Sequence, residues 1–141
     1  MAQVISATTR FARGGGKRAE FLAKARFLLD QSREHYRAGE VDLALEYAYQ
    51  SALRTAGARI AGSPVAQRKR RPTNAWDQLK LVDETGVAQA QVFEHYSRFR
   101  SRVSSGIERD PDRAAVAALM EKAAAFLAEV ELDIGGDFAA A

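Results

Sequence analysis

The chain has 141 residues, of which 47% are apolar and 28% are charged, as in an ordinary soluble globular domain. It contains no cysteine, which excludes disulfides, thiolate nucleophiles and cysteine metal sites and favours a reducing, cytoplasmic location. No apolar run approaches the roughly 18 residues that span a membrane, and residues 1–18 lack the long apolar stretch of a signal peptide.

The net charge of +3 is unevenly distributed along the chain. From Glu108 to the end there are eight acids and three bases, a net charge of −5, so residues 1–107 carry +8. Such asymmetry steers an anionic partner toward one part of a protein. The two segments can equally attract each other inside one fold, and the sequence leaves both interpretations open.

The first half of the chain predicts two long helices after a flexible, glycine-rich leader at residues 1–16. Apolar side chains at three-and-four spacing predict the first helix from about Lys17 to Arg37, with an interruption at Gly39. The second helix is predicted from about Val41 to Ala61. Its apolar face is made of small residues, which let another helix approach closely, so we expect this helix to be central.

A loop should follow, because residues 62–64 (Gly-Ser-Pro) end the second helix. Asn74 is a suitable cap for a short helix that starts at Ala75, and Gly86 is expected to break that helix. A third long helix is predicted from about Val87 to Ser104.

The last long helix should start at residues 110–112 (Asp-Pro-Asp), because proline is favoured in the first turn. It carries the clearest amphipathic pattern in the chain, and residues 135–141 are expected to form a flexible tail.

No segment shows the two-residue alternation of a strand. The sequence therefore predicts an all-α fold, namely an antiparallel up-and-down four-helix bundle over residues 17–134, with one extra short helix in the second crossover.

The two histidines, His35 and His95, give no metal or catalytic pattern. Neither has a histidine or carboxylate partner three or four residues further along a helix, as a zinc site on a helix requires. There is no nucleophile-elbow motif, and the glycines of the leader lack the spacing of a phosphate-binding loop. We expect no metal and no cofactor.

Four consecutive cations, Arg68, Lys69, Arg70 and Arg71, lie in the loop after the second helix. They are candidates for contacts with nucleic-acid phosphates, which would give affinity without sequence specificity. The alternative is a solvated corner between two helices. Trp76 is an auxiliary candidate that would stack on a base if exposed, although its apolar neighbours at helical spacing favour a place in the core.

Arg98 and Arg102 are four residues apart and share a helix face with His95. This stripe is a second candidate for phosphate contacts, with His95 as an auxiliary residue. The alternative is a solvated face, or ion pairs with the acidic last helix.

The order of three segments resembles the short stand-alone HEPN-domain proteins of actinobacteria. The segments are the small-residue helix "LALEYAYQSALRTAGARI", then "RPTNAWDQLK" after the basic loop, and the final helix "AAVAALMEKAAAFLAEVE". The resemblance covers about residues 17–132, and it implies a helical bundle that often forms a homodimer.

Many members of that family are ribonucleases or ribonuclease toxins, with an active motif of arginine and, four to six residues later, histidine. In this chain Arg26 is too far from His35 and Arg33 is too close, while His95 has no arginine within reach upstream. No catalytic residue is therefore carried over.

The sequence as a whole predicts a non-catalytic HEPN-like homodimer that binds RNA, another nucleic acid or a nucleotide through the two groups of cations. The first alternative is a regulatory module that binds a protein partner encoded nearby, as in toxin–antitoxin pairs. The second is a ribonuclease that uses His95 with arginines from across a dimer interface.

Overall fold

The structure is a computed structural model that describes residues 2–140, with side-chain environments for residues 16–133. Within residues 2–140 the chain forms helices and no strand, which confirms the predicted all-α fold class. The elements are α1 (Ala2–Arg37), α2 (Val41–Ala61), the 3-10 turn η1 (Pro64–Gln67), α3 (Ala75–Lys80), α4 (Glu84–Ser104) and α5 (Arg113–Ala140). None of the helices, over the part of the chain that was searched, has both the length and the apolar character needed to cross a bilayer.

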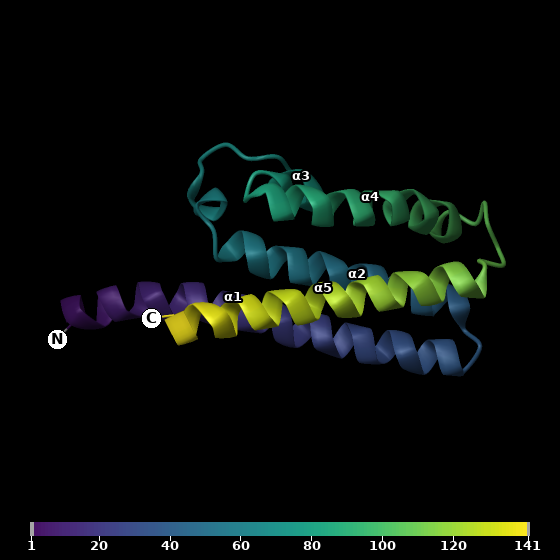
Figure 1. Cartoon of the computed structure of the whole chain (residues 1–141), viewed down its shortest axis with the longest axis horizontal. Helices are drawn as coiled ribbons and strands as arrows, with labels where there is room; N and C mark the ends of the chain where they lie inside the picture. The colour runs from purple at the N-terminus through teal and green to yellow at the C-terminus, as the bar shows by residue number, and fades with distance from the viewer. Residues whose placement is uncertain (1, 141) are drawn as a thin grey trace.

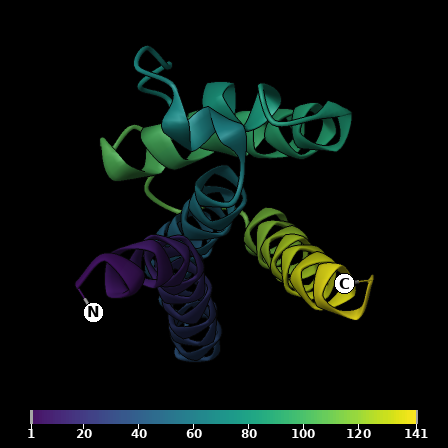
Figure 2. The ribbon, with the colours of Figure 1, turned by 90° about the vertical axis from the view of Figure 1, so that its left-hand side faces the viewer.

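Helix α2 lies at the centre of the fold and contacts each of the other helices. Figures 1 and 2 show α3 and α4 on one side of α2, with α1 and α5 on its other sides. The close approach is possible because the buried positions of α2 are small: Ala44, Ala48, Ala52 and Ala56 are fully buried. The prediction of a central second helix is confirmed.

A cluster of aromatic side chains joins the two sides of the core. Trp76 of α3 stacks on Phe93 of α4 with ring centroids 5.2 Å apart, and Phe93 contacts Phe126 of α5 at the same separation. The indole Nε1–H of Trp76 donates a 2.9 Å hydrogen bond to the hydroxyl of Tyr49 in α2. The short helix α3 is thereby fixed to α2 and α4 by the side chain of Trp76, and Leu79 of the same helix is also fully buried.

The first turn of the fold follows the sequence prediction closely. Helix α1 ends at Arg37, and Gly39 has a φ of 82°, a left-handed conformation that favours glycine. The Gly39 N–H donates to the carbonyl of Tyr36, and the Glu40 N–H donates to that of His35. These bonds satisfy the last carbonyl groups of α1 and return the chain into α2.

The start of α4 differs from the prediction. The helix begins at Glu84 rather than near Val87, because the Asp83 carboxylate accepts a 2.6 Å hydrogen bond from the Gly86 N–H and caps the helix. Gly86 is therefore part of the first turn and does not break a helix. Its lack of a side chain is needed at this position, since an added Cβ would clash with the carbonyl of Leu79.

The two predicted flexible ends, residues 1–16 and 135–141, fall almost entirely on residues whose side-chain environments lie outside the described part of the chain. Residues 2–16 and 135–140 belong to α1 and α5 in the backbone as described. The flexibility of the leader and of the tail stays a prediction.

Candidate nucleic-acid interface

The basic loop, residues 68–71, is held at both of its ends. Before it, η1 buries Val65, whose N–H donates to the Ser63 hydroxyl. After it, the Asn74 side chain caps α3 by accepting a 2.8 Å hydrogen bond from the Trp76 N–H, as the sequence predicts. The Gln78 amide also donates to the carbonyl of Pro72 at 2.6 Å. The four cations thus lie on a short loop that is held at both ends and projects from the fold on the side of α3 and α4 (Figure 2).

All four cations of this loop are exposed. None of them forms an ion pair with a carboxylate of residues 16–133. Among residues 16–133, the loop cations make a single side-chain hydrogen bond, which is long: an Arg71 guanidinium nitrogen lies 3.5 Å from the carbonyl oxygen of Ala66. These charges are free to bind an external anion.

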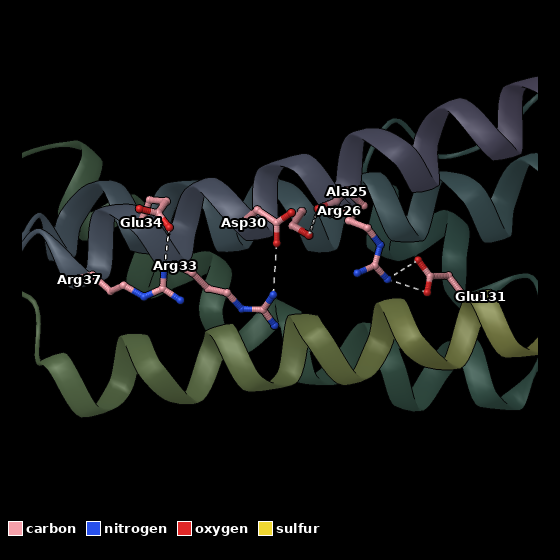
Figure 3. A network of polar contacts seen from close by, with 8 residues as sticks. Ala25, Arg26, Asp30, Arg33, Glu34, Arg37 and Glu131 are labelled. Atoms are coloured by element: carbon pink, nitrogen blue, oxygen red, sulfur yellow. Dashed lines mark hydrogen bonds and ion pairs between the residues drawn. The ribbon is translucent and has the colours of Figure 1, made fainter.

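The exposed arginines of α1 form a contrasting group, shown in Figure 3. Arg26 binds both carboxylate oxygens of Glu131 in α5 at 2.7 Å. Arg33 and Arg37 pair with acids three residues earlier on their own helix, Asp30 and Glu34. Each of these positive charges is matched inside the molecule, so this face offers less to a polyanion than the basic loop does.

A cavity of about 470 Å³ lies beside the basic loop, between α1, α2, α3 and η1. Four cations line it: Lys17, Arg54, Arg71 and Arg100. The remaining lining side chains are two glutamines and a set of apolar residues, with no Asp or Glu among them. Arg71 therefore joins the loop to a larger positive concavity. Lys17 and Arg54 were not singled out from the sequence, because only the packing of α1 against α2 brings them together.

Arg100 has a different role from the other three cations. Its guanidinium binds the Glu46 carboxylate of α2 through two hydrogen bonds of 2.7 and 2.8 Å, and it lies 5.4 Å above the ring of Tyr49. These hydrogen bonds hold the pKa of Glu46 below its ordinary value, although partial burial opposes the shift. The pair stabilises the α2–α4 contact and leaves Arg100 only partly available to a ligand.

We expect this pair to contribute to acid sensitivity. Because folding lowers the pKa of Glu46 from 4.5, its stabilising effect is complete above that pH and is lost as the pH falls through the lowered pKa. Glu46→Gln should reduce the free energy of unfolding by about 1 kcal/mol at pH 7 and by much less at pH 3. Urea unfolding at the two pH values measures this, and an equal loss at both would contradict it.

The second group of candidate residues lines a separate cavity, of about 450 Å³, near the end of α4. His95, Arg98 and Arg102 are all exposed and all line it, as their shared helix face predicts. Glu108 and Asp112 line the same cavity. It shares no lining residue with the cavity beside the basic loop, so the structure places the two groups of cations at different sites. The mixed charge of the second site favours a polyanion less.

The auxiliary assignment of Trp76 needs correction. Its side chain is only 2% exposed, and its faces and N–H are taken up by Phe93 and Tyr49. It cannot stack on a base in this conformation, and the alternative that placed it in the core is confirmed. Its contribution to the candidate site is indirect, because it fixes the helix that follows the loop.

His35 belongs to neither cavity. Its Nδ1 lies 3.1 Å from a carboxylate oxygen of Glu40, and its ring stacks on Tyr47 with centroids 5.0 Å apart. These contacts connect the end of α1 with α2. Within the residues searched, no three side chains of His, Asp or Glu are arranged to hold a metal ion.

Comparison with known proteins identifies the family to which the chain belongs. Neither the curated proteins nor the solved structures that were searched include a match to this chain. The model of the HEPN_SAV_6107-like HEPN family matches residues 36–131, which is more than half of the 141 residues. The matched range runs from the end of α1 to α5 and includes the basic loop and the cavity near the end of α4, whereas Lys17 and Phe21 of the cavity beside the basic loop precede it. The chain therefore belongs to this HEPN family.

Proposed function

We propose that this protein binds RNA or another nucleic acid through the basic loop, without cleaving it. The observation that carries the proposal is the set of four adjacent, exposed cations without a carboxylate partner among residues 16–133, on a loop anchored at both ends. An anchored loop loses little conformational entropy when it binds, so its charges contribute more to affinity. Lys17 and Arg54 extend the positive surface from the loop onto α1 and α2.

The absence of cleavage is proposed from the sequence of the chain. No arginine stands four to six residues before either histidine. In addition, His35 is engaged with Glu40 and Tyr47, while His95 lies in the separate cavity with Arg98 and Arg102. An intact RNA probe after prolonged incubation supports this part of the proposal, whereas cleavage that is lost in His95→Ala would favour the ribonuclease alternative.

Three features of the predicted assembly remain part of the proposal. The central position of α2 between α1, α4 and α5 supports the antiparallel up-and-down four-helix bundle that the sequence predicts. A homodimer and a cytoplasmic location are proposed with it, the first from family resemblance and the second from the lack of cysteine.

The first test is the fluorescence anisotropy of a labelled single-stranded RNA, titrated with the protein at several salt concentrations. If all four loop cations contact phosphates, the affinity should fall about 50-fold between 50 and 200 mM salt, given a slope of about 0.7 per contact on a single strand. Joint replacement of Arg68, Lys69, Arg70 and Arg71 by alanine should weaken binding strongly at low salt and remove most of this slope.

A matched pair of double variants controls for net charge. Arg68→Ala with Arg70→Ala removes two charges from the loop, and Arg33→Ala with Arg37→Ala removes two charges from the paired face of α1 (Figure 3). Only the loop variant should weaken binding. Equal effects of the two variants would show that the protein attracts RNA by net charge alone, and no effect of either would refute the proposed interface.

A further inference from the structure

The cavity beside the basic loop has one accessible aromatic side chain. Phe21 of α1 is half-buried, and its ring packs against the backbone of α2 at Gly57, where an added Cβ would lie 3.0 Å from ring carbon Cε1. Lys17 Nζ and the Arg54 guanidinium carbon each lie 6.0 Å from the ring centroid. Both cations lie over the ring, and aromatic side chains within positively charged grooves are the places where proteins stack the bases of single strands.

Two glutamines supply hydrogen-bond acceptors in the same cavity. The Gln50 amide nitrogen donates to Glu46 at 2.9 Å, and the Gln78 amide nitrogen donates to the Pro72 carbonyl at 2.6 Å. With the nitrogens fixed in this way, the carbonyl oxygens of both side chains accept no bond from any residue of the described part. They suit the amino and ring N–H groups of a nucleobase.

The charge and the volume of the cavity also suit a nucleotide. Lys17, Arg54 and Arg71 line the cavity without an ion pair to a carboxylate of residues 16–133. The volume of about 470 Å³ falls within the roughly 300–1,000 Å³ of small-molecule sites. The site therefore combines a ring, two glutamines and three cations that have no ion pair within residues 16–133.

We propose that this cavity holds one unpaired nucleotide, with its base against Phe21 and its phosphate among Lys17, Arg54 and Arg71. The inference rests on the proposed function, since the basic loop would hold the phosphates that flank this nucleotide. A base in a duplex is stacked and paired, so it cannot enter the cavity without being extruded. The protein should then prefer a single strand to a duplex, while the loop alone would not distinguish them.

The test compares a labelled single-stranded RNA with its duplex by anisotropy in moderate salt. Phe21→Ala removes the ring, and Ala66→Trp fills the cavity from η1. Each should weaken single-strand binding about tenfold and leave duplex binding unchanged. Phe21→Trp, which keeps a stacking surface, should restore the affinity. Circular dichroism identifies any variant that fails to fold, and Ala66→Trp then still tests the site without removal of the ring.

Titration calorimetry with AMP and UMP distinguishes a free nucleotide from one within a strand. Saturable binding of either compound that is lost in Phe21→Ala would assign the cavity to a free nucleotide, and single-strand preference without it would assign the cavity to RNA. Both outcomes support the site. Wild-type affinity of Phe21→Ala and Ala66→Trp for the single strand, with no mononucleotide bound, would overturn it. The double variant Arg68→Ala with Arg70→Ala, which leaves the cavity residue Arg71 in place, would then decide the proposed function, so the two failures are distinguishable.

Discussion

Replacement of Trp76 by alanine is expected to lower the free energy of unfolding by about 3–5 kcal/mol, the largest effect of any single substitution considered for this chain. The side chain is 2% exposed and stacks on Phe93, and its N–H is bonded to Tyr49. Alanine would leave a large cavity between α2, α3 and α4, and it would leave the Tyr49 hydroxyl without this partner. Urea unfolding followed by circular dichroism measures the loss.

Two further variants give this prediction its controls. Trp76→Phe keeps an aromatic ring and loses the hydrogen bond, so it should cost about 1–2 kcal/mol. Phe27 is 53% exposed, and Phe27→Ala should change stability by less than about 1 kcal/mol. If Trp76→Ala were no more destabilising than Phe27→Ala, the tryptophan would not be part of the core, and a direct role in stacking on RNA would have to be reconsidered.

The tryptophan also connects stability with the candidate interface. It is the second residue of α3, and the helix cap at Asn74 stands between it and the four cations. Loss of the Trp76 side chain would destabilise the core. It would also free α3, which anchors the C-terminal end of the basic loop. RNA affinity of Trp76→Phe should therefore stay near that of the wild type, since its ring still holds α3 in place.

Local signals in the sequence were sufficient for most helix boundaries. The left-handed conformation of Gly39 follows the end of α1, and Asn74 caps α3. Both features could be predicted because they depend only on residues nearby in the sequence. The predicted start of α4 near Val87 is wrong. Glycine often interrupts helices, so Gly86 was expected to lie between the short helix and α4 rather than inside the first turn of α4. The Asp83 carboxylate caps α4 at Gly86, and the Leu79 carbonyl leaves no room for a side chain there. The contact with the Leu79 carbonyl exists only when α3 and α4 are packed together.

The candidate site was harder to predict, because most of it comes from different helices. The run of cations at residues 68–71 is visible in the sequence, but Lys17 and Arg54 join it only through the packing of α1 on α2. Spacing along α4 correctly grouped Arg98 and Arg102 with His95. It could not show that Arg100 pairs with Glu46, a residue 54 positions earlier in the chain.

The uneven charge of the chain has a mixed explanation. The acidic last helix does attract a basic residue inside the fold, because Glu131 forms an ion pair with Arg26 of α1. The basic loop receives no such partner from the described residues of α5. Part of the positive charge is thus neutralised within the molecule, and part of what remains, namely the basic loop with Lys17 and Arg54, lies at or beside one cavity.

Asp83→Ala is expected to lower the free energy of unfolding by about 2–3 kcal/mol, the second largest effect. The carboxylate caps α4 at the Gly86 N–H and binds both terminal nitrogens of Arg59, a side chain that is only 14% exposed. Loss of the cap should cost about 1 kcal/mol, and within residues 16–133 the mostly buried guanidinium would keep only the side-chain oxygen of Gln89 as a partner, which adds a similar or larger cost. Urea unfolding at pH 7 measures the sum.

Asp83→Asn and Asp30→Ala separate these contributions. Asparagine keeps an oxygen for the Gly86 N–H and loses the charge, so its cost should be about half that of alanine. Asp30 pairs with Arg33 on the surface of α1, where both side chains are largely exposed, and its replacement by alanine should cost about 0.5 kcal/mol or less. The bonds from Arg59 and Gly86 lower the pKa of Asp83, so the difference between wild type and Asp83→Asn should disappear as the pH falls through that lowered pKa. A cost of Asp83→Ala as small as that of Asp30→Ala would mean that Arg59 finds another partner, and that the α2–α4 contact does not depend on this carboxylate.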